Sequence, residues 1–205
     1  MKRILGAAIS SVFAVVASLC IIATAKTPDE TQSNNAPSQA TAVFAGGCFW
    51  CMESDFEKLG GVGDVVSGYA GGVLQNPTYR RHDGHLEVVQ VPYDPAVISY
   101  RELADYFFRH IDPLDDEGQF CDRGHSYTTA IFYSTSDEYN AAVAAKADAE
   151  AALGQSVVTP LIELDKFWIA EDYHQDYYKK NPVRYKFYRT SCGRDRRVNQ
   201  VWGKH

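Results

Sequence analysis

The sequence predicts one α+β domain, in which helices pack on a mixed β-sheet and a long C-terminal tail follows as coil. Strand-like runs of β-branched and apolar residues alternate irregularly with amphipathic helical segments. Their order is β-α-β-β-α-β-α-β-α, without an internal repeat. The chain has 205 residues, 45% of them hydrophobic, which is enough for a single hydrophobic core.

The first 25 residues have the features of a secretory signal peptide. Lys2 and Arg3 precede a long apolar run, which ends in the small-x-small pattern of a cleavage site at residues 23–25. We therefore expect an exported protein, periplasmic or secreted, although the run is long enough to serve as an uncleaved membrane anchor. Residues 26–40 contain no large apolar side chain and predict a flexible linker, so that the domain spans residues 41–205.

The charge of the domain excludes one class of partner. Removal of the signal peptide takes away two of the 20 basic residues and none of the 26 acidic ones, which leaves a formal charge of −8. Because nucleic acids are polyanions, so acidic a protein is not expected to bind them.

A strand that turns into a helix begins the domain. Residues 41–45 are mostly apolar and predict the strand, which Gly46 and Gly47 follow. Apolar side chains then recur at helical spacing as far as Gly60, at Cys48, Met52, Phe56 and Leu59. Cys48 should therefore lie at a helix N-terminus, where unpaired N–H groups and the helix dipole lower the pKa of a thiol.

Further strands and a helix follow in the middle of the chain. Residues 65–70 predict a strand that runs into a glycine-rich turn, and residues 85–93, apolar on both faces, predict a central strand. Ser99 and Glu102 form a capping box, which marks the start of a helix. Residues 128–133 predict the next strand.

The C-terminal third contains the last predicted elements. Residues 135–154 predict an alanine-rich capped helix, and residues 157–164 predict a strand that Pro160 places at a sheet edge. Residues 170–181 predict a tyrosine-rich helix, which the following proline ends. The tail at residues 183–205 is rich in glycine and basic residues and predicts surface coil.

Glu87 is an acidic residue in the most apolar predicted strand. It shares a strand face with Val89 and Val91. If that face is buried, loss of solvation raises the pKa of the carboxyl and keeps it protonated. A strand-end glutamate that faces water near Gly84 is the equally open alternative.

Several blocks of the sequence resemble the type A peptide methionine sulfoxide reductases. The residues Gly-Cys-Phe-Trp at 47–50 are similar to the signature of that family. Other blocks occur in family order at residues 68–72, 76–79, 84–87, 93–95, 98–100 and 192–195, so that the resemblance covers roughly residues 41–203. Two departures are Cys121 in front of the family aspartate and Thr128 in place of a usual arginine.

This resemblance implies a site and a reaction. Cys48 would be the nucleophile, and Glu87 would protonate the sulfoxide oxygen. Among the substrate-binding residues, Phe49 and Trp50 would form the wall of a methyl pocket. Tyr79 and Tyr127 would contact the oxygen together with Glu87, and Asp122 would support the site. Reduction of the S epimer, free or within proteins, is implied, with no metal or organic cofactor. We expect a monomer.

The products would be methionine and a sulfenic acid on Cys48, which a second thiol converts to a disulfide. Cys51 lies one helical turn away and Cys192 lies in the tail, and the sequence does not order these two candidates. Cys121 adjoins the site loop, so the remaining pair would relay electrons or form a structural bridge. A thioredoxin-like dithiol protein would then reduce the enzyme.

Three alternatives to this function use the same cysteines. Cys48 and Cys51 form a C-x-x-C at a helix start, which is also typical of thiol–disulfide oxidoreductases, although the strand–helix–strand order of that fold is missing. All four domain cysteines could bind zinc, but only one C-x-x-C pair exists. A non-enzymatic secreted module could use them as two structural disulfides, which a core of this size makes unnecessary.

Overall fold

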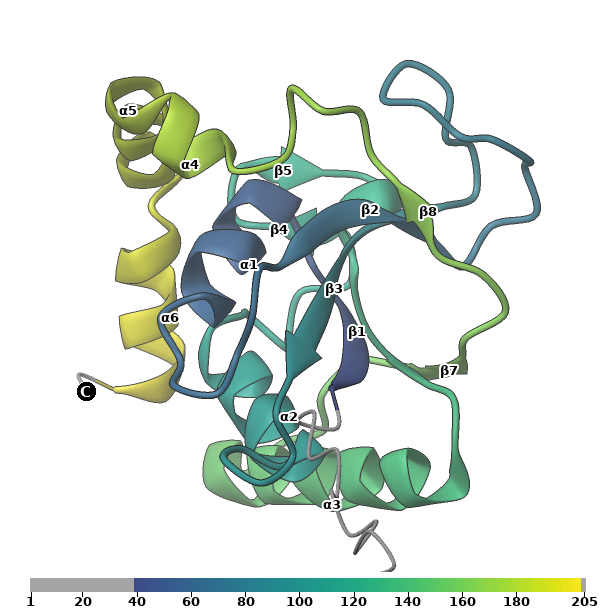
Figure 1. The fold of residues 1–205 in the computed structure, drawn as a ribbon. Coiled ribbons are helices and arrows are strands. Elements are labelled where there is room, and N and C mark those ends of the chain that lie inside the picture. The colour runs from purple at the N-terminus through teal and green to yellow at the C-terminus, as the bar shows by residue number, and fades with distance from the viewer. Residues whose placement is uncertain (1–38, 204–205) are drawn as a thin grey trace, which may run out of the picture. The chain divides into compact units, whose positions relative to one another are not determined.

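Six strands form a mixed sheet at the centre of the structure, a computed structural model that describes residues 39–203 (Figure 1). The strand order is β7-β6-β1-β3-β2-β8, and only the β6–β7 pairing is parallel. The bounds are β1 (Ala40–Gly46), β2 (Val66–Ala70), β3 (Leu86–Tyr93), β6 (Thr129–Tyr133), β7 (Leu161–Glu163) and β8 (Trp168–Ile169). A separate two-stranded ribbon pairs β4 (Gly118–Gln119) with β5 (Asp122–Arg123). The predicted α+β class with a mixed sheet is therefore confirmed.

The predicted signal peptide lies outside the described residues, as does nearly all of the predicted linker. Strand β1 begins at Ala40, one residue before the predicted start of the domain. Within residues 39–203, no helix combines the length and the apolar character that crossing a membrane requires.

Helix α1 (Phe49–Phe56) follows β1 directly, and helices α2 (Tyr100–Arg109) and α3 (Ser136–Leu153) lie together at one end of the sheet (Figure 1). Local sequence signals set their ends, as predicted. Ser99 and Glu102 form both hydrogen bonds of a capping box at the start of α2. Thr135 caps α3, and Gly154 ends it with the left-handed conformation that glycine adopts without strain.

Strand β1 buries side chains on both faces. Ala42 and Phe44 point into the larger core cluster, which includes residues of α1, α2 and α3, whereas Val43 and Ala45 point into a smaller cluster on the other face. The ring of Phe44 stacks on that of Phe56 at 5.0 Å and on that of Phe107 at 5.2 Å. The start of α1 is thus fixed against the central strands by aromatic packing.

The predicted coil tail is wrong, because residues 182–202 form two helices. Helix α5 (Pro182–Cys192) begins with proline at its first position, where the missing N–H breaks no helical hydrogen bond. Gly193, with φ of 68°, ends α5 and leads into α6 (Arg194–Trp202). Each helix has one buried residue, Tyr185 in α5 and Arg194 in α6. Arg189 of α5 and Arg194 of α6 contact α1 through Asp55 and Met52, respectively.

The predicted helix at residues 170–181 is also wrong in extent. Only α4 (Tyr177–Lys180) is helical there. The side chain of Gln175 bonds to both backbone groups of Ser67, and Asp176 has the left-handed φ of 53°, which interrupts a helix. These tertiary contacts override the helical spacing of the tyrosines.

Candidate active site

Cys48 lies at the junction between β1 and α1. It occupies the N-cap position of α1, and its side chain is only 5% exposed. The two glycines before it are needed for this turn. A Cβ on Gly46 would lie 2.4 Å from the sulfur of Met52, and a Cβ on Gly47, whose φ is 79°, would lie 2.6 Å from the Cβ of Gln119.

Glu87 lies next to this junction on β3, and its carboxyl is buried, with 2% of the residue exposed. The buried alternative is therefore confirmed. Its Oε2 accepts a hydrogen bond of 3.1 Å from the backbone N–H of Phe49. Burial raises the pKa of Glu87 to about 8; the nearby charges of Asp122 and Cys51 add to this, and hydrogen bonds from Phe49 and Tyr127 oppose it.

A cavity of about 50 Å³ lies between these two residues. All five predicted substrate-binding residues line it together with Cys48 and Glu87, whereas Cys51 and Cys192 do not. The full lining is Cys48, Phe49, Trp50, Tyr79, Glu87, Asp122, Tyr127 and Tyr188. Side chains from two strands, two α-helices, one loop and the short 3-10 helix His125–Tyr127 thus converge on one small space.

An aromatic cage holds one wall of the cavity. The ring of Trp50 stacks on Tyr177 at 3.7 Å, with an angle of 9° between the planes. Its indole N–H donates to Nδ1 of His174 at 3.2 Å, and the ring of His174 lies 4.9 Å from that of Phe49. These contacts fix Trp50 in one orientation.

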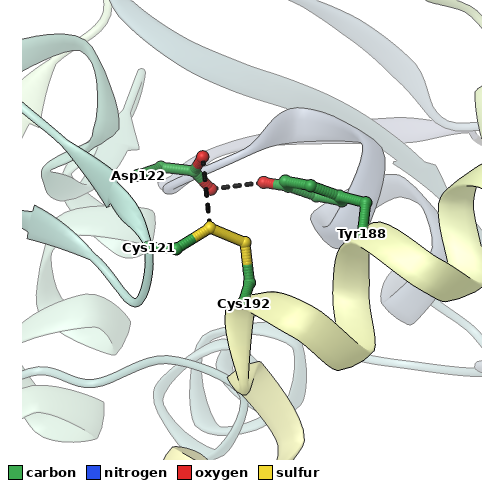
Figure 2. Close-up of a disulfide and its surroundings, with 4 residues drawn as sticks. All are labelled: Cys121, Asp122, Tyr188 and Cys192. Atoms are coloured by element: carbon green, nitrogen blue, oxygen red, sulfur yellow. Dashed lines mark hydrogen bonds between the residues drawn. A yellow bond between two sulfur atoms is a disulfide. The ribbon is translucent and has the colours of Figure 1, made fainter.

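Tyr188 is a cavity residue that the sequence interpretation missed. Its hydroxyl donates a hydrogen bond to Oδ2 of Asp122 (Figure 2). Burial raises the pKa of Tyr188, so that it remains a neutral donor. The missed signal was the proline at residue 182 followed by the glycine at residue 193, which are helix start and stop residues and place Tyr188 on a helix.

The four domain cysteines form two separate pairs. Cys121 and Cys192 form a disulfide with a Cα–Cα distance of 4.8 Å, whereas Cys48 and Cys51 are free and buried. Figure 2 shows that the disulfide joins the loop of Asp122 to the end of α5. The zinc alternative and the alternative of two structural disulfides are therefore wrong.

The expected low pKa of Cys48 is also wrong for this state. Burial raises the pKa of Cys48 well above its ordinary value, and the neighbouring Cys51 and Glu87 raise it further. In addition, the first N–H of α1 is bonded to Glu87 rather than to the thiol. Loss of solvation thus outweighs the effect of the helix N-terminus, and Cys48 is a neutral thiol.

Comparison with known proteins identifies this arrangement. The family model described as "Peptide methionine sulfoxide reductase" matches residues 40–205, which is the whole described domain. The chain belongs to the peptide methionine sulfoxide reductase family. It is an oxidoreductase of the MsrA branch of this family, which excludes the alternative of a non-enzymatic module and that of a general thiol–disulfide oxidoreductase.

Relatives with this name have closely similar sequences. MsrA 2 of Rhizobium meliloti is 54% identical over 164 residues, which cover 79% of this chain and 83% of that protein. MsrA/MsrB of Vibrio cholerae is 48% identical over 198 residues, 93% of this chain, but the match covers only 52% of that longer protein. The chain therefore spans about half of the latter.

The fold is shared with solved reductases. The reduced form of Mxr1 from Saccharomyces cerevisiae superposes with a TM-score of 0.67 at 32% identity, covering 71% of this chain and 87% of that chain. The same yeast protein has also been solved in complex with Trx2, at 24% identity to this chain.

Proposed function

We propose that this chain reduces the S epimer of methionine sulfoxide, with Cys48 as nucleophile and Glu87 as acid. The observation that carries the proposal is that a thiol and a carboxyl protonated up to about pH 8 line the same cavity. Reduction of a sulfoxide requires a nucleophile that attacks the sulfur and an acid that protonates the oxygen. Cys48 would be the nucleophile and Glu87 the acid.

The first step transfers oxygen from the substrate to Cys48. The sulfur of Cys48 attacks the sulfoxide sulfur, while Glu87 gives a proton to the oxygen, and the proton that Cys48 loses replaces it. The S–O bond of the substrate breaks and an S–O bond forms on Cys48, so that methionine leaves and Cys48 becomes a sulfenic acid. Because Oε2 of Glu87 accepts the Phe49 N–H, the proton belongs on Oε1.

The cavity suits the reacting end of the substrate. Its volume of about 50 Å³ accommodates a methyl group or an oxygen rather than a whole side chain. Phe49 and Trp50 offer ring surfaces to the S-methyl group, because contacts between sulfur and aromatic rings are favourable. Tyr79 and Tyr127, whose pKa values burial raises, supply neutral hydroxyls where charge develops on the oxygen.

Cys51 is the resolving thiol in this proposal. It is the free cysteine one turn after Cys48, and it packs in the same buried cluster. Cys192, the other predicted candidate, is already bonded to Cys121. Attack of Cys51 on the sulfenic acid releases water and leaves a Cys48–Cys51 disulfide.

We further propose that a thioredoxin-like dithiol protein reduces this disulfide, a partner of the kind that the Trx2 complex of yeast Mxr1 suggests. The N-terminal sequence pattern supports export, so that the enzyme would repair oxidised methionine in exported proteins. Free methionine sulfoxide carries the same reacting group, so we expect it to be a substrate as well. We expect the enzyme to act as a monomer.

The test uses the full chain, dithiothreitol and each epimer of a blocked methionine sulfoxide. Wild type should consume only the S epimer, Cys48→Ser should consume neither, and Cys51→Ser should release one methionine per enzyme in a single turnover. Arg196→Gln, a change at an exposed helix position, is the control and should match wild type. Turnover by the Cys48→Ser variant would overturn the proposal.

A further inference from the structure

Two arginines of the C-terminal helices lie close to one buried carboxylate of α1. Asp55 of α1 is 1% exposed, and its Oδ1 lies 3.0 Å from Nη2 of Arg189 on α5. Nε of Arg194 on α6 lies 3.7 Å from Oδ2 of the same carboxylate. Because Arg194 is itself only 2% exposed, at least one full positive charge is held out of water here.

The position of Arg194 is fixed by its other donors. Nη1 donates to the carbonyl of Gly46 at 3.1 Å, and Nη2 donates to the carbonyl of His110 at 2.9 Å and contacts the sulfur of Met52 at 2.8 Å. Its guanidinium also lies 4.7 Å from the ring centre of Phe120. The charge therefore cannot move away to solvent.

This charged cluster adjoins Cys51. Asp55 is four residues after Cys51 on α1, so that the two side chains share one helix face. Tyr185 of α5 packs against Cys51, and its hydroxyl accepts a hydrogen bond of 3.0 Å from Nη1 of Arg189. A continuous set of contacts thus runs from Arg189 through Tyr185 to the thiol.

The local charge balance is positive. Two guanidinium groups face one buried carboxylate, while the other acidic partner of Arg189, Asp195, is 64% exposed and its charge is screened by water. Lys58 lies 2.9 Å from Asp55, but its side chain is 61% exposed, so water screens its charge in the same way. A buried ion cluster is not needed for stability alone, since apolar packing serves as well or better, so a functional reason is favoured.

We propose that Arg189 and Arg194 are positioning residues for the resolving step, and that their charge holds Cys51 as a thiolate ready to attack the Cys48 sulfenic acid. This inference rests on the proposed function. In the step, the sulfur of Cys51 forms a bond to the sulfur of Cys48, and the S–O bond breaks. Hydroxide leaves as water with a proton from Glu87, so that Cys51 is oxidised and the sulfenic sulfur is reduced.

The balance of forces on Cys51 agrees with this role. A hydrogen bond from Cys48 lowers the pKa of Cys51 most, and burial opposes it. The charges of Arg194 and Arg189 lower the pKa further, whereas the charge of Asp55 raises it. The titratable and charged groups that face this thiol from the surrounding elements are Cys48, Asp55, Glu87, Tyr185, Tyr188, Arg189 and Arg194.

The first measurement is the thiolate absorbance at 240 nm of the full chain against pH. The background is Cys48→Ser, and the same variant with Cys51→Ser is subtracted so that only Cys51 contributes. Arg189→Gln or Arg194→Gln should each move the midpoint up by about one pH unit, as expected for loss of one nearby charge at an effective dielectric constant of about 20. Arg189→Lys and Arg194→Lys should keep the midpoint of the Cys48→Ser background.

The control is Arg196→Gln, which removes the same charge from an exposed position of α6 and should leave the midpoint unchanged. An unchanged midpoint in a folded Arg189→Gln variant would overturn the inference, because a purely structural arginine lowers the unfolding temperature without moving the titration. Arg189 is the safer of the two positions, since 14% of its side chain is exposed and Arg194 remains to hold α6.

The second measurement separates this inference from the proposed function. In single turnover with Cys48 and Cys51 intact, both Gln variants should still release one methionine per enzyme. They should trap up to about fivefold more sulfenic acid with dimedone at pH 7, because a one-unit rise of a midpoint at or below pH 7 lowers the thiolate fraction by at most about that factor. Normal release with wild-type trapping refutes only the role of the arginines. Absence of release from wild type refutes the proposed function itself.

Discussion

Replacing Glu87 with glutamine should strongly slow catalysis and yet stabilise the fold. In the unfolded chain the carboxyl ionises near its ordinary pKa of 4.5, whereas in the folded state it keeps its proton up to about pH 8. The folded state therefore binds more protons between these values and loses stability as the pH rises. At about 1.4 kcal/mol per pH unit, the penalty is about 1 kcal/mol at pH 5, about 3 at pH 7 and about 4 at pH 8.

Glutamine keeps a carbonyl that can accept the Phe49 N–H, but it has no ionisable proton. The assay is urea unfolding of wild type and Glu87→Gln at pH 5, 6, 7 and 8. The difference in unfolding free energy should grow by about 3 kcal/mol over this range in favour of the variant. Single-turnover reduction should fall by about 10²- to 10⁴-fold, the usual contribution of a general acid. Parallel stability curves from pH 5 to pH 8 would show that Glu87 is already ionised and would refute the reasoning.

Three further changes test the site and its support. Tyr188→Phe should raise KM and lower kcat/KM about fivefold to tenfold, because it removes one hydrogen bond to Asp122 that is worth about 1 kcal/mol or slightly more. The control is Tyr139→Phe, at an exposed position, which should match wild type in the same steady-state assay. In the double variant Cys121→Ser/Cys192→Ser, the free energy of unfolding measured in urea should fall by up to about 4 kcal/mol, since the disulfide closes a span of 71 residues. Single turnover by Cys48 should persist. Loss of that turnover would mean that the disulfide itself takes part in the first step. Ser99→Ala should cost about 1 kcal/mol in thermal unfolding through the broken capping box, and an unchanged melting temperature would show that the cap carries no net stability.

Local signals in the sequence were sufficient to predict the position of Cys48. Two glycines, an N-cap cysteine and helical spacing placed Cys48 at the start of α1, because each of these signals acts within a few residues. The burial of Glu87 could be stated only as one of two alternatives. It depends on β1 and β2 pairing with both edges of β3, which strand periodicity does not reveal.

Local sequence patterns did not predict that residues from separate segments line one cavity. Tyr79 and Tyr127 lie in segments without regular periodicity, and they were placed at the site by resemblance to the family rather than by spacing. Tyr188 was missed because the polar tail was taken as coil. Its helices are held by a buried arginine, Arg194, and hydropathy patterns give no signal for an arginine that points inward.

The pKa of Cys48 shows a local rule that tertiary structure overrides. A helix N-terminus stabilises a thiolate by only about 1 kcal/mol, whereas removing a charge from water costs several. The first N–H of α1 is in any case bonded to Glu87. The sequence can place a residue at a helix end, but it cannot show which acceptor will bond to the unpaired N–H groups there.

A neutral Cys48 is consistent with the proposed catalysis, because the thiol would then ionise only when the substrate is bound. Burial raises the pKa of both Cys48 and Glu87, so that the cavity holds two protons and no charge on its reacting groups. A neutral buried thiol reacts slowly with oxidants in general, since the thiolate is the reactive form. In the proposed mechanism, a sulfoxide oxygen that enters takes the proton of Glu87, the carboxylate becomes a base beside the thiol, and Cys48 ionises as it attacks. In the proposed arrangement, the negative charge that the buried cavity does not tolerate rests on Cys51, outside the cavity, where the charges of Arg194 and Arg189 lower the pKa of the thiol.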